Sequence, residues 1–186
     1  MQLILALLLS LSTAFGPIAF APSMEGISTQ DDAITVFLVR HAEKCSAPAS
    51  DPDLTPYGQQ RTQDLVRVLS HVELDAVYST PFARTLNTAS PVAAAHDVNI
   101  IETPAERGFM EALAERIKNG EANNVLVSGH SNTTPRVVNL LAGTEFEDLD
   151  ESVYDRLYIV TLHEDGTAGV QVLTYGAISG SEEDCG

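Results

Sequence analysis

Four side chains able to bind and transfer a phosphoryl group stand just beyond segments expected to form strands. They are Arg40, His41, Arg84 and His130. Reactive residues in an open α/β sheet lie past the carboxyl ends of the strands, so we expect these four to lie close together. Arginine offers planar, paired donors that match phosphate oxygens. An imidazole can attack phosphorus when a hydrogen bond fixes its other nitrogen. The residue types therefore predict a phosphate site with a nucleophilic histidine.

Short, almost continuous apolar runs predict the strands that position these residues. The clearest are residues 34–39, directly before Arg40 and His41, and residues 124–128, directly before Gly129 and His130. Runs of this kind are typical of strands buried on both faces of a sheet. Residues 76–79 and 98–101 are weaker candidates, and the first of these precedes the Thr80 to Arg84 segment.

Helical patterns alternate with these strands. Apolar residues share a helical face in three segments, at 65–69, 110–117 and 137–141. Thr-Pro pairs predict helix starts at Thr55, Thr80 and Thr134, because threonine caps free N–H groups and proline suits the first turn. Residues 157–162 and 168–174 predict an antiparallel hairpin at the sheet edge. The predicted fold is a three-layer α/β/α sandwich with a mostly parallel sheet and an antiparallel C-terminal hairpin.

Composition predicts one acidic domain. The chain has 186 residues, of which 44% are hydrophobic, and its formal net charge is −16. This charge argues against nucleic acid or an anionic membrane surface as a partner, because both require a basic face. We interpret the acidic run at residues 145–151 as solvated surface. No protein partner is evident, and the expected partner is a phosphorylated substrate.

The N-terminal segment differs from the rest. Residues 1–15 are mostly apolar and carry no charged side chain. A signal peptide over residues 1–22 is the favoured interpretation, which predicts an exported protein, periplasmic or extracellular. An uncleaved membrane tether and a buried N-terminal helix are the alternatives, and contact with a membrane is expected only for the tether. We expect the domain over residues 25–178 and a loose acidic tail over residues 179–186.

The two cysteines, Cys45 and Cys185, leave two possibilities open. They could pair in an oxidising compartment, where the chain-entropy model gives a stabilisation of roughly 4–5 kcal/mol, or remain free thiols. Neither fits a Cys-x5-Arg phosphatase motif, since Asp51 stands six residues after Cys45.

Four segments in order resemble the motifs of the histidine phosphatase superfamily, which has the phosphoglycerate-mutase-like fold. They are Leu38 to Lys44 (LVRHAEK), Asp53 to Arg61 (DLTPYGQQR), Tyr78 to Ala89 with its central Arg84, and Val125 to Thr133 (VLVSGHSNT). Tyr154 to Leu157 also resembles a late segment of small members that carry the RHAEK sequence. The resemblance covers residues from about Ile34 to Thr161.

The resemblance implies roles for the site. His41 would carry the phosphoryl group, and Arg40, Arg84 and His130 would bind and polarise it. No metal or other cofactor is implied. The family places a proton-donating acid after the third strand, which favours Glu106. Glu102, Glu111 and Glu43 compete for this role, and Glu43 and Lys44 could instead brace the loop.

The predicted function is a metal-independent phosphomonoester hydrolase acting through a phosphohistidine, with a small phosphoester or a phosphorylated protein side chain as substrate. One alternative is an inactive phospho-ligand or partner-binding module of the same fold. Another is a serine hydrolase that uses Ser131 and His163, since Gly129 to Thr133 approaches a Gly-x-Ser-x-Gly elbow. A mutase is disfavoured because the segment from Asn87 to Glu121 is short.

Overall fold

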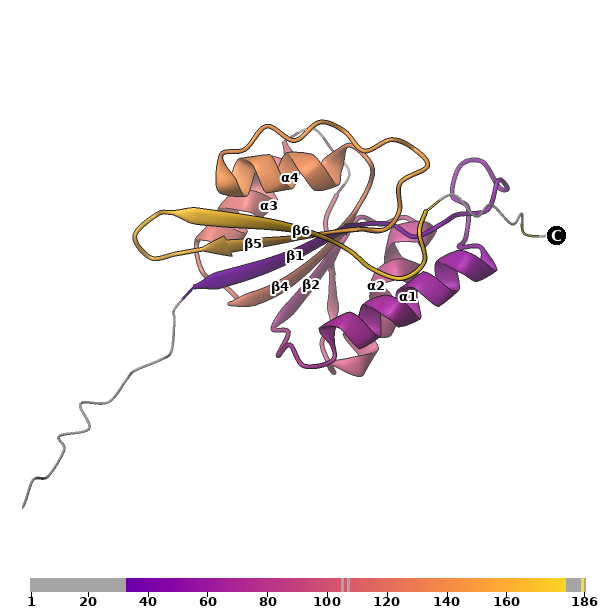
Figure 1. Cartoon of the computed structure of the whole chain (residues 1–186), viewed down its shortest axis with the longest axis horizontal. Coiled ribbons are helices and arrows are strands. Elements are labelled where there is room, and N and C mark those ends of the chain that lie inside the picture. Colours follow the sequence, from indigo (N-terminus) through magenta and orange to yellow (C-terminus); the bar gives the residue numbers. More distant parts are fainter. Residues whose placement is uncertain (1–32, 105, 107, 180–184, 186) are drawn as a thin grey trace, which may run out of the picture. The chain divides into compact units, whose positions relative to one another are not determined.

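In a computed structural model, residues 33–104, 106, 108–179 and 185 are described, and they form one mixed sheet with four helices (Figure 1). The strands are β1 (Ile34–Arg40), β2 (Ala76–Ser79), β3 (Ile100–Glu102), β4 (Asn124–Gly129), β5 (Arg156–Leu162) and β6 (Ala168–Thr174). The helices are α1 (Pro56–Leu69), α2 (Ala83–Ala95), α3 (Phe109–Lys118) and α4 (Thr133–Ala142).

The sheet has the strand order β3-β2-β4-β1-β5-β6. Strand β1 runs parallel to β4, and β2 runs parallel to both β3 and β4. Strand β5 is antiparallel to β1 and forms a hairpin with β6 at the edge. The predicted mostly parallel sheet with an antiparallel C-terminal hairpin is therefore confirmed.

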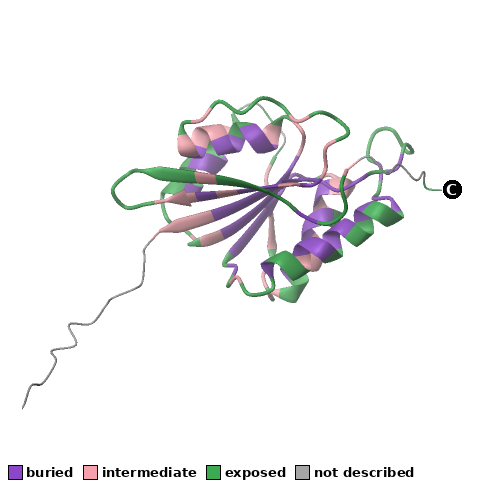
Figure 2. Ribbon diagram, viewed as in Figure 1, coloured by how far each residue is buried: buried purple, intermediate pink, exposed green. Residues whose placement is uncertain are grey.

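Two apolar cores separate the three layers. One core joins one face of the sheet to α3 and α4, through residues such as Leu38, Leu113 and Val138. The other joins the opposite face to α1 and α2, through residues such as Val39, Leu65 and Val92. Figure 2 shows the buried central strands between the helices and the exposed edge strand β6. Burial of β1, β2 and β4 on both faces explains why these runs are almost continuously apolar.

The helix starts differ in part from the Thr-Pro prediction. Thr55 caps α1 as predicted, since its Oγ1 accepts a hydrogen bond from Gly58 N at 3.0 Å. Helix α2 instead begins at Ala83, whose N–H donates to Asp51 of a distant loop. Helix α4 begins one residue before Thr134, whose hydroxyl donates to the carbonyl of Val39. Tertiary hydrogen bonds thus take over two sites at which the sequence predicted a local cap.

The C-terminal segment is attached to the domain. Cys45 and Cys185 form a disulfide bond across 140 positions of sequence, which settles the alternative left open above. Ser179 Oγ accepts hydrogen bonds from the backbone N–H groups of Tyr154 and Asp155. The prediction of a loose tail is wrong at Ser179 and Cys185, because each has a specific partner within the domain.

The predicted leader over residues 1–22 and the domain start at residue 25 lie outside the described residues. Within the described part of the chain, no helix is both long enough and apolar enough to cross a membrane.

Candidate active site

His41 lies at the carboxyl end of β1, with its side chain 3% exposed. Its backbone N–H donates to the carbonyl of Gly129 at the end of the parallel strand β4. Its Nδ1 lies 2.8 Å from the carbonyl oxygen of Ala42. A carbonyl can only accept, so Nδ1 carries the proton in this hydrogen bond. The lone pair of the neutral ring is therefore on Nε2, the nitrogen left to act as a nucleophile.

His130 faces His41 from the end of β4, with 5.5 Å between the ring centroids. Its Nε2 lies 2.9 Å from Thr80 Oγ1, which lies 2.9 Å from Thr85 Oγ1. The Thr85 hydroxyl donates to backbone carbonyls, so the Thr80 hydroxyl donates to Thr85 and accepts from Nε2–H of His130. This chain of hydroxyls orients the second imidazole.

Both imidazoles are held in the neutral form. Burial, opposed in part by the Ala42 hydrogen bond and reinforced by the charges of Arg40, His130 and Arg84, lowers the pKa of His41 to about 3. Burial and the charges of Arg84 and Arg40 lower the pKa of His130 to about 4. A neutral imidazole is the nucleophilic form, so the surroundings keep His41 ready to react at neutral pH.

Arg84 lies in the first turn of α2, beside His130. Its guanidinium carbon is 4.5 Å from the ring centroid of Phe82, and that ring packs edge-on against His130 at 5.3 Å. Asp51 holds this turn, because its Oδ1 accepts from Ala83 N at 2.8 Å and lies 3.6 Å from Arg84 Nη1. The charge of Arg84 is thereby fixed next to both imidazoles.

Arg40 is buried, with 1% of the side chain exposed. Its Nη1 donates to the carbonyls of Asp150, Glu151 and Val153 at 2.8–3.1 Å, and its Nη2 pairs with the Glu151 carboxylate at 2.5 Å. The guanidinium also lies 4.3 Å from the ring centroid of Tyr154. The four predicted phosphate-site residues thus lie together around the carboxyl ends of β1 and β4.

Comparison with known proteins agrees with this site. A model of the histidine phosphatase superfamily (branch 1) matches residues 36–112, which include Arg40, His41 and Arg84. Residues 36–112 of this chain are therefore similar to the histidine phosphatase superfamily. Phosphoserine phosphatase 1 of Hydrogenobacter thermophilus is 36% identical over 75 residues, which are 37% of this chain and 36% of that protein. The chain therefore aligns with about a third of this curated relative.

Two solved structures, a protein histidine phosphatase and a phosphoglycerate mutase, share the fold. The protein histidine phosphatase SixA, complexed with tungstate, matches 76% of this chain and 97% of its own at 21% identity, with a TM-score of 0.57. A phosphoglycerate mutase from Bacillus anthracis matches 76% of this chain and 92% of its own chain at 13% identity, with a TM-score of 0.54. The predicted phosphoglycerate-mutase-like fold is confirmed.

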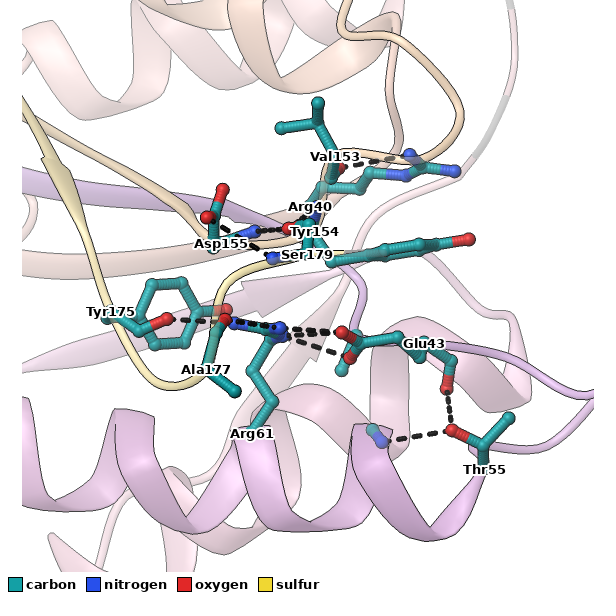
Figure 3. A network of polar contacts seen from close by, with 12 residues as sticks. Arg40, Glu43, Thr55, Arg61, Val153, Tyr154, Asp155, Tyr175, Ala177 and Ser179 are labelled. Carbon is teal, nitrogen blue, oxygen red and sulfur yellow. Dashed lines mark hydrogen bonds and ion pairs between the residues drawn. The ribbon is translucent and has the colours of Figure 1, made fainter. Parts of the chain in front are cut away.

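A buried ion pair lies close to His41 in the sequence. Arg61 Nε lies 3.0 and 2.9 Å from the two oxygens of Glu43, and Arg61 Nη2 donates to Glu43 Oε1 at 2.6 Å. The same guanidinium donates to the carbonyls of Tyr175 and Ala177, as Figure 3 shows. Glu43 is therefore committed to bracing the loop, as one of the two interpretations of this residue predicted.

The other candidate acids do not contact the imidazoles. Glu106 and Glu102 are exposed, and Glu111 pairs with Arg136 at the surface. Glu106 does follow β3, at the carboxyl edge of the sheet. The structure thus brings together four of the five predicted site residues and leaves Glu106 outside their contacts.

Several residues of the site were not predicted. Thr88 accepts from Ala42 N and donates to Arg84 O, so it connects the loop after His41 to α2. Glu151 is exposed, as its interpretation as solvated surface predicted, but its side chain also pairs with Arg40 and accepts from Ser131 Oγ at 2.5 Å, which was not predicted. The resembling segments contained Thr88 and Tyr154, whereas no local pattern distinguished Glu151 from its acidic neighbours.

The serine hydrolase interpretation fails on geometry. His163 follows β5 beside the start of β1, because Leu162 pairs with Ile34. Ser131 follows β4 at the opposite end of the sheet, and its hydroxyl donates to Glu151. The histidine that this mechanism needs is therefore at the wrong end of the molecule.

Proposed function

We propose that this protein is a metal-independent phosphomonoester hydrolase that forms a covalent phosphohistidine on His41. The observation that carries the proposal is the hydrogen bond from His41 Nδ1 to the carbonyl of Ala42, within a buried and positively charged site. It leaves Nε2 of a neutral ring with its lone pair available.

In the proposed first step, His41 Nε2 attacks phosphorus and the bond from phosphorus to the leaving oxygen breaks. Arg40 and Arg84 stabilise the charge on the phosphoryl oxygens. A bound dianion favours the imidazolium form of His130, which donates from Nδ1 while Thr80 holds Nε2. In the second step, water attacks phosphorus and the bond from phosphorus to Nε2 breaks. The proton of the water passes to the carboxylate of the proposed acid or to solvent, and phosphate leaves with His41 neutral again.

Leaving groups differ in their need for a proton. A nitrophenolate departs without one, whereas an alkoxide requires an acid. We propose Glu106 as that acid, on the basis of its place after β3 at the carboxyl edge of the sheet.

The test is release of p-nitrophenol from p-nitrophenyl phosphate by the purified protein in the presence of EDTA. His41→Ala should abolish turnover, and the matched control His163→Ala, at the far end of the sheet, should retain it. An inactive parent that still binds vanadate or tungstate would favour the phospho-ligand-binding module instead.

We also propose that the protein is exported, with residues 1–22 as a leader. The Cys45–Cys185 disulfide supports this, because such bonds persist in oxidising compartments. Fractionation of the native host followed by N-terminal sequencing tests it, and a cytosolic chain with an intact residue 1 would contradict it.

A further inference from the structure

Glu151 joins the phosphate site to the loop above it. Its Oε2 pairs with Arg40 Nη2 at 2.5 Å, and its Oε1 accepts from Ser131 Oγ at 2.5 Å. Ser131 directly follows His130, so the carboxylate spans the two histidine-bearing segments. The hydrogen bond from Ser131, opposed in part by burial and reinforced by Arg40 and Lys44, lowers the pKa of Glu151, so the group is charged at neutral pH.

The backbone that carries Glu151 is fastened at the site. Arg40 Nη1 holds the carbonyls of Asp150, Glu151 and Val153, and Leu149 N donates to Ser131 O at 2.9 Å. The Glu151 side chain, in contrast, is 75% exposed. The carboxylate can therefore leave Arg40 while its residue remains at the rim of the site.

The guanidinium of Arg40 divides into two edges. Nη1 donates to the backbone carbonyls of residues 150, 151 and 153 and so holds that loop. Nε is buried and has no hydrogen-bond partner among the described residues, and Nη2 holds Glu151. Paired donors of this kind match two oxygens of one phosphoryl group. A substrate that takes this edge must displace the Glu151 carboxylate.

When the substrate displaces Glu151 from Arg40, the Glu151 carboxylate lies beside the phosphoryl dianion. Its loop has five acidic residues among positions 145–151. Like charges at this separation repel unless a cation lies between them. Lys44 is the exposed cation near Glu151, and Arg40 is then committed to phosphate. A cationic group on the substrate would offset the remaining repulsion between Glu151 and the phosphoryl group. It would pair with the Glu151 carboxylate in place of Arg40.

We propose that Glu151 is a specificity-determining residue that favours phosphomonoesters bearing an ammonium group a few bonds from the phosphate. The proposal rests on the phosphatase function proposed above. An exposed ion pair supplies a preference of about two- to fivefold in kcat/KM over a neutral substrate of equal size.

The experiment compares phosphoethanolamine with 2-hydroxyethyl phosphate, which replaces the ammonium with a hydroxyl. The kcat/KM ratio of this pair is measured for the parent, for Glu151→Gln and for the control Glu147→Gln. Glu147 is an exposed acidic residue of the same loop, and the substitution changes the net charge equally. Circular dichroism checks that each variant is folded, and p-nitrophenyl phosphate reports activity independently of the ammonium.

We expect the parent and Glu147→Gln to prefer phosphoethanolamine and Glu151→Gln to lose the preference. This inference is overturned if the parent hydrolyses p-nitrophenyl phosphate but its kcat/KM for phosphoethanolamine equals that for 2-hydroxyethyl phosphate. That result leaves the phosphatase function intact. The inference also fails if Glu151→Gln raises kcat/KM equally for both substrates, because Glu151 would then only compete for Arg40. A parent inactive on p-nitrophenyl phosphate instead contradicts the proposed function.

Discussion

Glu43 and Arg61 form a buried ion pair two residues beyond the proposed nucleophile, with both carboxylate oxygens in contact with Arg61 Nε. Their side chains are 8% and 3% exposed. Because Arg61 also holds the carbonyls of Tyr175 and Ala177, the pair connects the His41 loop, α1 and the C-terminal segment. Gly58 permits this approach, since a Cβ at its position would lie 2.2 Å from the carbonyl oxygen of Glu43.

Glu43→Gln should lower both stability and turnover. The substitution keeps the shape of the side chain but leaves the Arg61 guanidinium buried without its counter-charge, which costs about 3–5 kcal/mol of unfolding free energy. Urea denaturation measures the loss, and kcat should fall because the His41 loop loses its brace. Arg67→Ala is the control, since the pair of Arg67 with Asp64 has a 75% exposed arginine and contributes at most about 1 kcal/mol. Equal losses in the two variants would contradict a special role for the buried pair.

Asp51→Ala should weaken phosphate binding through Arg84. Asp51 caps the first turn of α2 at Ala83 N, and loss of a cap costs about 1 kcal/mol. A looser first turn should raise KM for p-nitrophenyl phosphate several-fold and weaken vanadate inhibition in parallel. Asp51→Asn keeps an acceptor oxygen, so its KM for p-nitrophenyl phosphate should lie between those of the parent and Asp51→Ala. An unchanged KM in Asp51→Ala would show that α2 positions Arg84 without this contact.

Reduction of the Cys45–Cys185 disulfide should lower the unfolding free energy by about 4–5 kcal/mol on the chain-entropy model. Thermal melts with and without a phosphine reductant measure the effect. The Cys185→Ser variant should melt at the temperature of the reduced parent and show no further change with reductant. If the reductant does not change the melting temperature of the parent, the disulfide bond contributes nothing to stability in solution.

The fold was predictable because its signals are local. Buried strands such as β1 and β4 are apolar over most of their length, and Gly143 ends α4 in a left-handed conformation with φ of 67°. The close placement of the four predicted phosphate-site residues could be predicted in the same way, because each follows a predicted strand. Such features depend on a few neighbouring residues, so they can be recognised in a single sequence.

The remaining features depend on contacts between distant segments. Arg61 and Ala177 are 116 residues apart, and Arg40 and the Glu151 carboxylate are 111 apart. No periodicity marks such pairs, so Glu151 looked like its acidic neighbours and the C-terminal segment looked loose. The same limit applies to Glu106, because a position after β3 does not specify where the side chain points.

His41 should remain neutral down to at least pH 5. Burial and the charges of Arg40, His130 and Arg84 set its pKa at about 3, well below the ordinary value of 6.5, so protonation of the nucleophile occurs only below about pH 4. An NMR titration of histidine Cε1–H signals tests this, with His41→Ala identifying the resonance. The His41 signal should not shift between pH 8 and pH 5, and a midpoint near 6.5 would contradict the described environment.

The most direct test of a phosphohistidine on His41 is to trap the phosphorylated protein during turnover. The protein is mixed with excess p-nitrophenyl phosphate, quenched with alkali, digested and mapped by mass spectrometry. Phosphohistidine survives alkali and is lost in acid, which distinguishes it from a phosphoserine. We expect a phosphoryl group on His41 that forms and decays at rates consistent with kcat. A phosphoryl group on another residue, or full turnover in His41→Ala, would contradict it.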